Sequence, residues 1–277
     1  MATRLQDIRR ASKVINACIK HGLDYFVHAY GFGWHLPLLK RIQFRKQTLP
    51  ESIPQKIRAV MEELGGGYIK LGQLLSMRPD LLPPEYCEEF KRLRDDTTPL
   101  SFGTIKETIE TELKQPINRL FKTVDKTPIG SASVAQVHKA TLHNGKKVVI
   151  KIQRPNVKQQ FEEDIDILNY LAYKIEQRLK NNAFNPVAII QEFERYTKNE
   201  LNFVVEASNI EKFCNNFKNA KTVIIPKVHW LYTKEKIVVM DYLEGEKLSE
   251  IKKISEKDRK KIAERIMDAT LKQLFEH

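Results

Sequence analysis

The amino-acid sequence predicts an α+β fold, in which a helical N-terminal extension precedes an antiparallel sheet and long helices. Three observations predict it. Apolar residues recur at helical spacing along the first part of the chain, the pattern changes to strand-like alternation at about residue 118, and two long helical stretches then separate one strand pair from a second.

The first predicted element is a basic helical segment over about residues 5–45. It combines positive charges with apolar residues, namely Arg9, Arg10, Lys13, Lys20, Ile15, Leu23, Phe26 and Val27. A basic amphipathic helix can lie on a membrane surface. It can equally pack against the rest of the protein, and the sequence leaves both interpretations open.

The stretch over residues 53–83 predicts two helices with a break between them. Gly65–Gly67 interrupts the apolar spacing and should end or bend the first helix. Lys70 and Gln73 are three residues apart, so they project from one face of the second helix. Further helices are predicted over about residues 84–95 and 102–114.

Strand-like alternation then predicts an antiparallel hairpin. Residues 134–142 and 148–153 alternate, and Asn144-Gly145 between them is a strong signal for a two-residue turn. The turn folds Lys151 back beside the segment Pro128–Ser133, so a nucleotide under that segment would lie within reach of the ammonium group. An ordinary hairpin with one solvated lysine fits the same pattern.

Two long helices and a second hairpin are predicted next. The helices cover about residues 156–180 and 186–216, and the hairpin covers residues 222–243. A last helix begins at about residue 255, where Ser255 can cap it. Its apolar residues are expected to face inward, and these are Ile262, Ile266 and Leu274.

The order of these elements matches that of a protein-kinase nucleotide site. Such a site has a loop over the phosphates, a Val-Ala-Ile-Lys strand beside it, and a helical glutamate that pairs with the lysine. Here Val148-Val149-Ile150-Lys151 has the strand position. Glu200 and Glu206 are six residues apart and face different directions, so one could meet Lys151 and the other Lys70.

The strand that ends in Met240-Asp241-Tyr242-Leu243 has the form of the connector between kinase lobes. Exposed backbone groups of such a connector hydrogen-bond adenine, and a bulky residue before it lines the pocket. A strand that runs into a turn explains the same residues in isolation. The combination of several weak signals in the correct order is much stronger than any one of them.

Composition and charge limit the classes of function. The net charge of +12 favours polyanions such as nucleotides, nucleic acid or an anionic membrane face. Acidic residues are interspersed throughout and no nucleic-acid-binding motif is recognised, so nucleic-acid binding is not expected. Cys18, Cys87 and Cys214 are widely spaced and predict neither a disulfide framework nor a zinc site. No apolar run approaches the ~20 residues that span a bilayer, and the N-terminus lacks the apolar core of a secretory signal.

Five segments together resemble the UbiB family of atypical kinase-like proteins, which are associated with ubiquinone biosynthesis. They are Lys-Leu-Gly-Gln at 70–73, Ser-Met-Arg-Pro-Asp-Leu-Leu-Pro at 76–83, Ser-Ala-Ser-Val-Ala-Gln-Val-His at 131–138, Val-Ile-Lys at 149–151 and Glu-Leu-Asn-Phe-Val-Val-Glu-Ala at 200–207. The resemblance spans nearly the whole chain. It implies a helical extension at 1–117, a protein-kinase-like small lobe with inserted helices at 118–245, and the first helix of a large lobe, otherwise mostly absent, at 246–277.

The resemblance also implies roles for individual residues. Lys151 resembles the lysine that contacts nucleotide phosphates, and Glu206 resembles its ion-pair partner. Lys70 and Gln73 resemble the family signature on a helix that covers the nucleotide site, and Glu200 resembles the acid that receives Lys70. The nucleotide-binding residues implied are Gly130, Ser131, Ala132, Ser133, Val134, Ala135, Lys151, Met240, Asp241 and Leu243. Some family members have aspartate where this chain has Asn202, which lowers the local negative charge.

The loop over residues 130–135 carries one glycine among alanines and serines. Glycine permits positive φ and a close approach of the backbone to phosphates, and alanine does neither as well. We hypothesise that Ala132 and Ala135 restrain this loop and bias which nucleotide it holds.

The ligand implied by the resemblance is ATP or ADP, with Mg²⁺ only if the large lobe is supplied. Residues 1–277 contain no His-x-Asp and no Asp-Phe-Gly sequence, so the catalytic Asp and the Mg²⁺ ligands are expected beyond His277 and the chain is expected to be inactive alone. The expected setting is cytoplasmic and peripheral to the bacterial inner membrane. Expected partners besides nucleotide are an isoprenoid lipid or proteins of ubiquinone biosynthesis. The alternative function is a non-catalytic, membrane-peripheral protein that binds isoprenoid lipid or acts as a scaffold.

Overall fold

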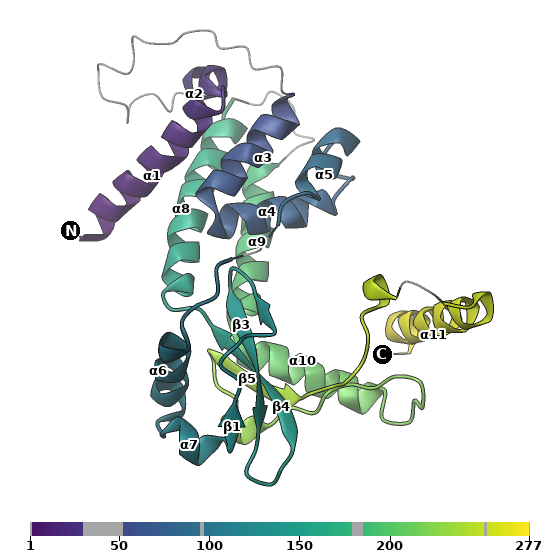
Figure 1. Cartoon of the computed structure of the whole chain (residues 1–277). Helices are drawn as coiled ribbons and strands as arrows, with labels where there is room; N and C mark the ends of the chain where they lie inside the picture. The colour runs from purple at the N-terminus through teal and green to yellow at the C-terminus, as the bar shows by residue number, and fades with distance from the viewer. Residues whose placement is uncertain (1, 30–51, 95–96, 179–184, 252–253, 277) are drawn as a thin grey trace. The chain divides into compact units, whose positions relative to one another are not determined.

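The computed structural model describes residues 2–29, 52–94, 97–178, 185–251 and 254–276 (Figure 1). They form a mixed fold of helices and one antiparallel sheet, as the sequence predicts. Two compact units share the chain. The first comprises Met1–Thr98, Ala132–Val134 and Arg154–Lys198, and the second comprises Pro99–Ser131, Ala135–Gln153 and Asn199–His277.

The first unit is helical. Its helices are α1 (Ala2–Lys20), α2 (Asp24–Ala29), α3 (Ile53–Leu64), α4 (Gly66–Ser76), α5 (Pro84–Phe90), α8 (Val157–Glu176) and most of α9 (Pro186–Glu200). Helix α4 packs against α3, α5 and α8. The break between α3 and α4 falls at Gly65, whose φ of 68° is a left-handed value that favours glycine.

Packing accounts for the basic amphipathic segment at the N-terminus. Helix α1 packs against α3 and α8, and its Val14, Ile15 and Ala17 are buried. Arg10 and Lys20 form ion pairs within the first unit, with Asp164 and Glu63. The part of the predicted segment at residues 30–45 lies outside the described residues.

The second unit is built on the sheet. Its strands are β1 (Thr123–Val124), β2 (Gly130–Ser131), β3 (Ala135–Thr141), β4 (Lys147–Gln153) and β5 (Ile237–Asp241), in the order β1-β3-β4-β5 with β2 also paired to β3. All pairs are antiparallel. Its other elements are α6 (Phe102–Leu113), α7 (Ile117–Leu120), α10 (Phe203–Asn216), η3 (Trp230–Tyr232), η4 (Leu248–Glu250) and α11 (Glu256–Phe275).

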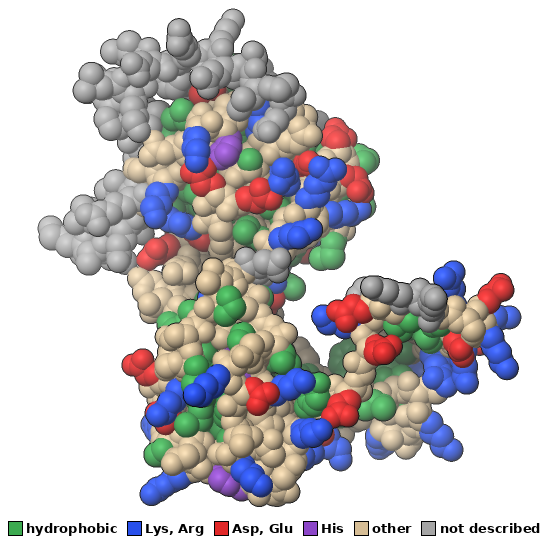
Figure 2. Space-filling model, in the orientation of Figure 1, with side chains coloured by type: hydrophobic (Ala, Val, Ile, Leu, Met, Phe, Trp, Pro, Cys, Tyr) green, Lys and Arg blue, Asp and Glu red, His purple; other side chains and the backbone are tan. Residues whose placement is uncertain are grey.

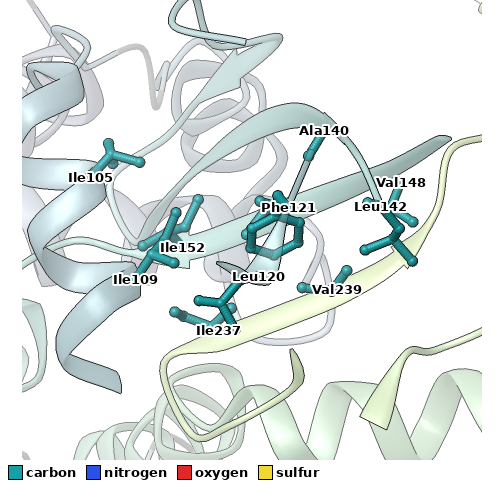
Figure 3. Packing of buried hydrophobic residues seen from close by; sticks show 11 residues of the cluster. Ile105, Ile109, Leu120, Phe121, Ala140, Leu142, Val148, Ile152, Ile237 and Val239 are labelled. Atoms are coloured by element: carbon teal, nitrogen blue, oxygen red, sulfur yellow. The ribbon is translucent and has the colours of Figure 1, made fainter. Parts of the chain in front are cut away.

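One face of the sheet carries the core of the second unit. Alternate residues of β4, which are Val148, Ile150 and Ile152, have no exposed surface, and they pack in one cluster with Ile109 of α6 and with Phe121, which follows α7 (Figure 3). Burial of one such aliphatic side chain contributes roughly 1.5–3 kcal/mol. The two-residue period therefore directs the other row of β4, including Lys151, to the opposite face.

The turn between β3 and β4 is longer than the sequence predicts. His143–Gly145 lies between Leu142 and Lys146, where the Leu142 amide donates to the Lys146 carbonyl at 2.9 Å. Gly145 has φ of 84°. The turn is thus a three-residue loop with a left-handed glycine, a common hairpin connection, and not the predicted two-residue turn.

Two predicted elements differ in the regions after β4. The helix expected over 186–216 is divided into α9 and α10, because the side chain of Asn202 caps α10 by accepting from the Val204 amide. The first arm of the hairpin expected over 222–243 forms only an isolated bridge, Val228↔Met240, since Trp230–Tyr232 turns into a 3₁₀ helix. Apolar alternation in this arm resembled a strand but did not exclude a turn.

Helix α11 begins as predicted but does not bury its apolar face. Ser255 caps it by accepting from the Asp258 amide. However, α11 contains no buried residue, and Ile266 and Leu274 are 51% and 70% exposed. The inward orientation was a wrong prediction, because helical periodicity shows which face is apolar but not whether another element covers it.

Candidate functional site

Lys151 and Glu206 form an ion pair on the face of the sheet opposite the core. The Lys151 Nζ donates to Glu206 Oε1 at 2.9 Å and to Oε2 at 2.8 Å. The same ammonium lies 4.9 Å from the centre of the Phe203 ring. Both charged side chains are about a third exposed or less, at 28% and 31%, so the pair is partly shielded from solvent. The structure thus brings together these two residues that the sequence singles out.

The second polar residue of the same row on β4 fixes where α10 begins. Gln153 is buried, and its Nε2 donates to the Leu201 carbonyl at 2.7 Å. The Phe203 amide donates to the Glu235 carbonyl at 2.9 Å, which holds the first residue of α10. Because α10 starts there, Glu206 falls in its first turn and meets Lys151. Sequence reasoning missed Gln153, although a polar residue that ends an apolar strand is a detectable signal.

The loop at residues 130–135 begins as a strand. Gly130 pairs with Val137 and Ser131 with Gln136, and Ala135 already belongs to β3, opposite Gln153 on β4. Ala132–Val134 belongs to the first unit, whereas Lys151 belongs to the second. A Cβ atom added to Gly130 would meet no other atom within 4 Å. The backbone therefore does not require glycine at position 130.

The Gln-Val-His end of the loop segment forms a buried polar network. The side chain of Gln136 exchanges hydrogen bonds with the backbone of Leu100, accepting at 2.8 Å and donating at 3.3 Å. Its Nε2 also lies 2.9 Å from His138 Nε2, and His138 Nδ1 lies 2.7 Å from the Asp125 carbonyl. Since a carbonyl only accepts, Nδ1 carries the proton and Nε2 accepts from Gln136. The two residues tie the segments around α6 and β1 to β3, which is a structural role.

The connector residues Met240, Asp241 and Leu243 differ in burial and in hydrogen bonding. Asp241 Oδ1 accepts from His229 Nε2 at 2.8 Å and pairs with Lys146 Nζ at 2.7 Å. Burial alone would raise the pKa of Asp241, but the hydrogen bonds from Lys146 and His229 outweigh it and lower the pKa below its usual value. The Asp241 amide donates to the Lys227 carbonyl at 3.0 Å. Met240 is half-buried and Leu243 is 45% exposed. The Asp241 side chain is thus engaged at the sheet edge.

The Lys-Leu-Gly-Gln segment lies in the middle of α4, which we call the signature helix. Lys70 Nζ lies 5.9 Å from the centre of the Tyr196 ring, and Gln73 Nε2 donates to the Leu93 carbonyl at 3.3 Å. A Cβ atom on Gly72 would collide with Leu93 Cδ1 and lie 2.8 Å from Met61 Sδ. Glycine at position 72 therefore lets the Leu93 and Met61 side chains pack closely against α4, and a larger residue would make them shift. Glu200 belongs to the second unit, and its pairing with Lys70 stays a prediction.

A buried carboxylate that sequence reasoning missed holds the start of the signature helix. The side chain of Asp164 is 1% exposed, and it pairs with Arg10 at 2.7 Å and accepts from the Gly67 amide at 3.1 Å. Burial raises the pKa of Asp164 against the lowering effect of Arg10 and Gly67. A signal exists in the sequence, since Asp164 shares the apolar face of α8 with Val157 and Phe161.

No group of three or more His, Cys, Asp or Glu side chains in the described part of the chain is arranged to hold a metal ion. Among the helices within the described ranges, none is both long enough and apolar enough to cross a membrane.

The chain is similar in sequence to a known domain family and to several known proteins. Residues 92–277 match the ABC1 atypical kinase-like domain. Proteins described as probable protein kinase UbiB are similar to the chain: that of Tolumonas auensis is 34% identical over 98% of this chain and 51% of its own length. That of Shewanella woodyi is 35% identical over 97% of this chain and 50% of its own length. The chain spans about half the length of the curated relatives it matches.

A solved structure is also similar. It is titled as the complex of Rv3197 with erythromycin from Mycobacterium tuberculosis, and it is 27% identical with a TM-score of 0.50. The match covers 69% of this chain and 48% of that one.

Proposed function

The chain belongs to the ABC1 atypical kinase-like family, and we propose that it binds ATP or ADP through Lys151 and the loop at residues 130–135, in support of ubiquinone biosynthesis. The observation that carries the proposal is the ion pair between Lys151 and Glu206. The link to ubiquinone rests on the similarity to proteins described as UbiB, of which this chain spans about half. Activities of the whole protein are therefore part of the proposal.

The ion pair supports a phosphate-binding role for the lysine. An ammonium group has three donors, and two of them are directed at the Glu206 carboxylate, which leaves one for a phosphate oxygen. The carboxylate also holds Nζ in one place, so less side-chain entropy is lost when a ligand binds. In kinase-like sites this lysine and glutamate must both be in place.

The adenine end of the ligand would lie at the connector. We assign Met240 and Leu243 to it, because the Asp241 side chain and amide are already engaged by Lys146, His229 and Lys227. Asp241 would act there by holding the sheet edge in place.

Nucleotide binding without turnover is the activity we propose for residues 1–277 on their own. Phosphoryl transfer needs an aspartate to position the nucleophile and ligands for Mg²⁺, and these residues contain no His-x-Asp and no Asp-Phe-Gly sequence. Mg²⁺-dependent ATP hydrolysis by the purified chain, abolished in Lys151→Ala, would overturn this part of the proposal.

Calorimetric titration of the purified chain with ADP and with ATP tests the binding. A hydrogen bond to a charged group contributes about 1.5–3 kcal/mol, so Lys151→Ala should weaken nucleotide binding by about 10- to 100-fold. Glu206→Gln should weaken it less, because the ammonium remains. Lys122→Ala removes an exposed lysine of the same unit and should leave the affinity unchanged. Equal affinities for Lys151→Ala and Lys122→Ala would contradict the proposal.

The ubiquinone part needs a measurement in cells. In the organism that carries this chain, Lys151→Ala introduced at its own locus should lower the ubiquinone content. A normal content in that strain, with the variant protein present at wild-type amount, would argue against the role.

Lipid binding is the second candidate, and exposed apolar side chains on α11 favour it. They are Ile266, Met267, Leu271, Leu274 and Phe275. In α1, by contrast, the apolar residues Val14, Ile15 and Ala17 are buried within the first unit. Co-sedimentation with liposomes that is independent of nucleotide and lost in Leu271→Ser would support an isoprenoid-lipid or scaffold function.

Nucleic acid is not among the partners we propose. Figure 2 shows acidic and basic side chains intermingled on the face it draws, and not a field of one sign. A basic stripe is the usual electrostatic footprint of a nucleic-acid-binding surface.

A further inference from the structure

One carbonyl group in the middle of the loop at residues 130–135 is held by two side chains. Thr97 Oγ1 donates to the Ala132 carbonyl at 2.8 Å, and Arg154 Nε donates to the same oxygen at 2.7 Å. The loop is thus restrained at Ala132 by two side chains that lie outside it.

The two donors also hold each other. Arg154 Nη2 donates to Thr97 Oγ1 at 2.6 Å and to the Thr98 carbonyl at 2.9 Å. The Arg154 amide donates to the Val134 carbonyl at 2.9 Å. Thr97, Arg154 and the Ala132 carbonyl are thus joined to one another by hydrogen bonds, and we call these three groups the loop clamp; all three belong to the first unit.

The clamp sets the direction of one backbone donor. A trans peptide is planar, so its carbonyl and its N–H point in opposite directions. No described peptide bond is cis. With the Ala132 carbonyl directed at Thr97 and Arg154, the amide of Ser133 must point away from them. A loop that binds phosphates does so with backbone N–H groups whose directions are fixed.

The clamp is also connected to the signature helix. Gln73 donates to the Leu93 carbonyl, and Gly72 permits the close approach of Leu93 to α4. Thr97 follows Leu93 by four residues along the chain. The residue that holds the loop is thus close in sequence to a residue that packs on the signature helix.

We propose that Thr97 and Arg154 are positioning residues for nucleotide binding, which hold the Ala132 carbonyl and so fix the direction of the loop backbone. This inference rests on the proposed function. In this proposal, two hydrogen-bond donors outside the loop restrain it. In the alternative explanation, the alanine residues of the loop restrain it by themselves.

Hydrogen exchange of the nucleotide-free chain and titration with ADP and ATP together test the clamp. The variants are Thr97→Val, which keeps the shape and removes the hydroxyl, and Arg154→Lys, which keeps the charge and removes the planar fork. Each should raise exchange of the amides at 130–135 by about 3- to 10-fold, the effect of losing its hydrogen bond to the Ala132 carbonyl, and weaken nucleotide binding by a similar factor. Because both act on one carbonyl, the double variant should be less than additive.

Thr98→Val is the matched control. Thr98 is exposed and contributes only its backbone carbonyl to Arg154, so this variant should match the wild type in both measurements. A general loss of structure would raise exchange throughout the first unit, whereas a lost clamp raises it at 130–135 only.

The outcomes separate this proposal from the proposed function. Unchanged loop exchange in Thr97→Val and Arg154→Lys overturns the clamp. Faster loop exchange with wild-type nucleotide affinity overturns the positioning role. If the wild-type chain binds neither nucleotide, the proposed function fails and the nucleotide part of this proposal fails with it, while faster exchange would still show that the clamp restrains the loop.

Discussion

The signature helix and the loop at residues 130–135 both carry a glycine that sequence reasoning connects with nucleotide binding, yet their surroundings are opposite. Gly72 is buried, and a side chain there would collide with Leu93 and Met61. Gly130 is exposed, and a side chain there would meet nothing within 4 Å. The signature helix is fixed by crowding and a buried charge, whereas the loop is fixed by hydrogen bonds to its backbone.

This difference shows that a motif can mark packing as well as ligand contact. The glycine of the Lys-Leu-Gly-Gln segment lies in close contact with the side chains of Leu93 and Met61. The glycine of the loop has no such explanation, so its role must come from the strand pairing or from a ligand. Substitutions in the two regions should therefore separate loss of stability from loss of binding.

Asp164→Ala should have the largest effect on folding. It leaves Arg10 and the Gly67 amide without their shared carboxylate, and breaking a buried charged pair typically costs about 3–5 kcal/mol. Since Arg10 is partly exposed, we expect a loss near 3 kcal/mol of unfolding free energy in urea denaturation. Glu162→Ala, which removes an exposed acid on the same helix, should change it by less than about 0.5 kcal/mol. Equal losses of unfolding free energy in both variants would show that the buried carboxylate does not hold the signature helix in place.

Gly72→Ala should come next. Overpacking costs about 1–3 kcal/mol, and the better helix propensity of alanine offsets up to about 1 kcal/mol of it. We expect a net loss of about 1–2 kcal/mol of unfolding free energy. Nucleotide affinity should fall only if the substitution also displaces α4. Gly103→Ala is the control, because Gly103 is also helical and an added Cβ makes an ordinary contact of 3.6 Å. A higher unfolding free energy in Gly72→Ala than in the wild type would show that the Leu93 and Met61 side chains make room for the methyl group without a loss of stability.

Whether a feature could be predicted from the sequence depended on whether it is set by residues close together in the chain or by distant contacts. Local signals were sufficient for the break at Gly65, the cap at Ser255 and the alternation of β4 that separates Ile150 from Lys151. Distant contacts were not visible: the start of α10 depends on Gln153 holding the Leu201 carbonyl, and the place of α4 depends on Asp164. The candidate site was predicted as a set of residues, but the residues that position that set were found only in the structure.

Ala132→Gly should have a smaller effect that is confined to the loop. Glycine adds freedom to the unfolded chain and costs about 0.4–1 kcal/mol where alanine fits the native backbone. Because Thr97 and Arg154 still hold the carbonyl, nucleotide affinity should fall less than in Arg154→Lys. Titration with ADP and ATP also tests whether alanine biases the choice of nucleotide. If the ratio of the ADP and ATP affinities is unchanged, the clamp and not the alanine side chain restrains the loop.

Gly130→Ala should have the smallest effect on folding and is the sharpest test of the comparison. Gly130 is absent from the glycines with positive φ, and the added Cβ meets no protein atom, so alanine should fit and alter the unfolding free energy by only about 0.5 kcal/mol. Any loss of nucleotide affinity in this variant must then come from contact between the new methyl group and the ligand. A loss of ADP binding at wild-type stability would place the ligand against Gly130, whereas unchanged binding would mean that the ligand does not contact this position.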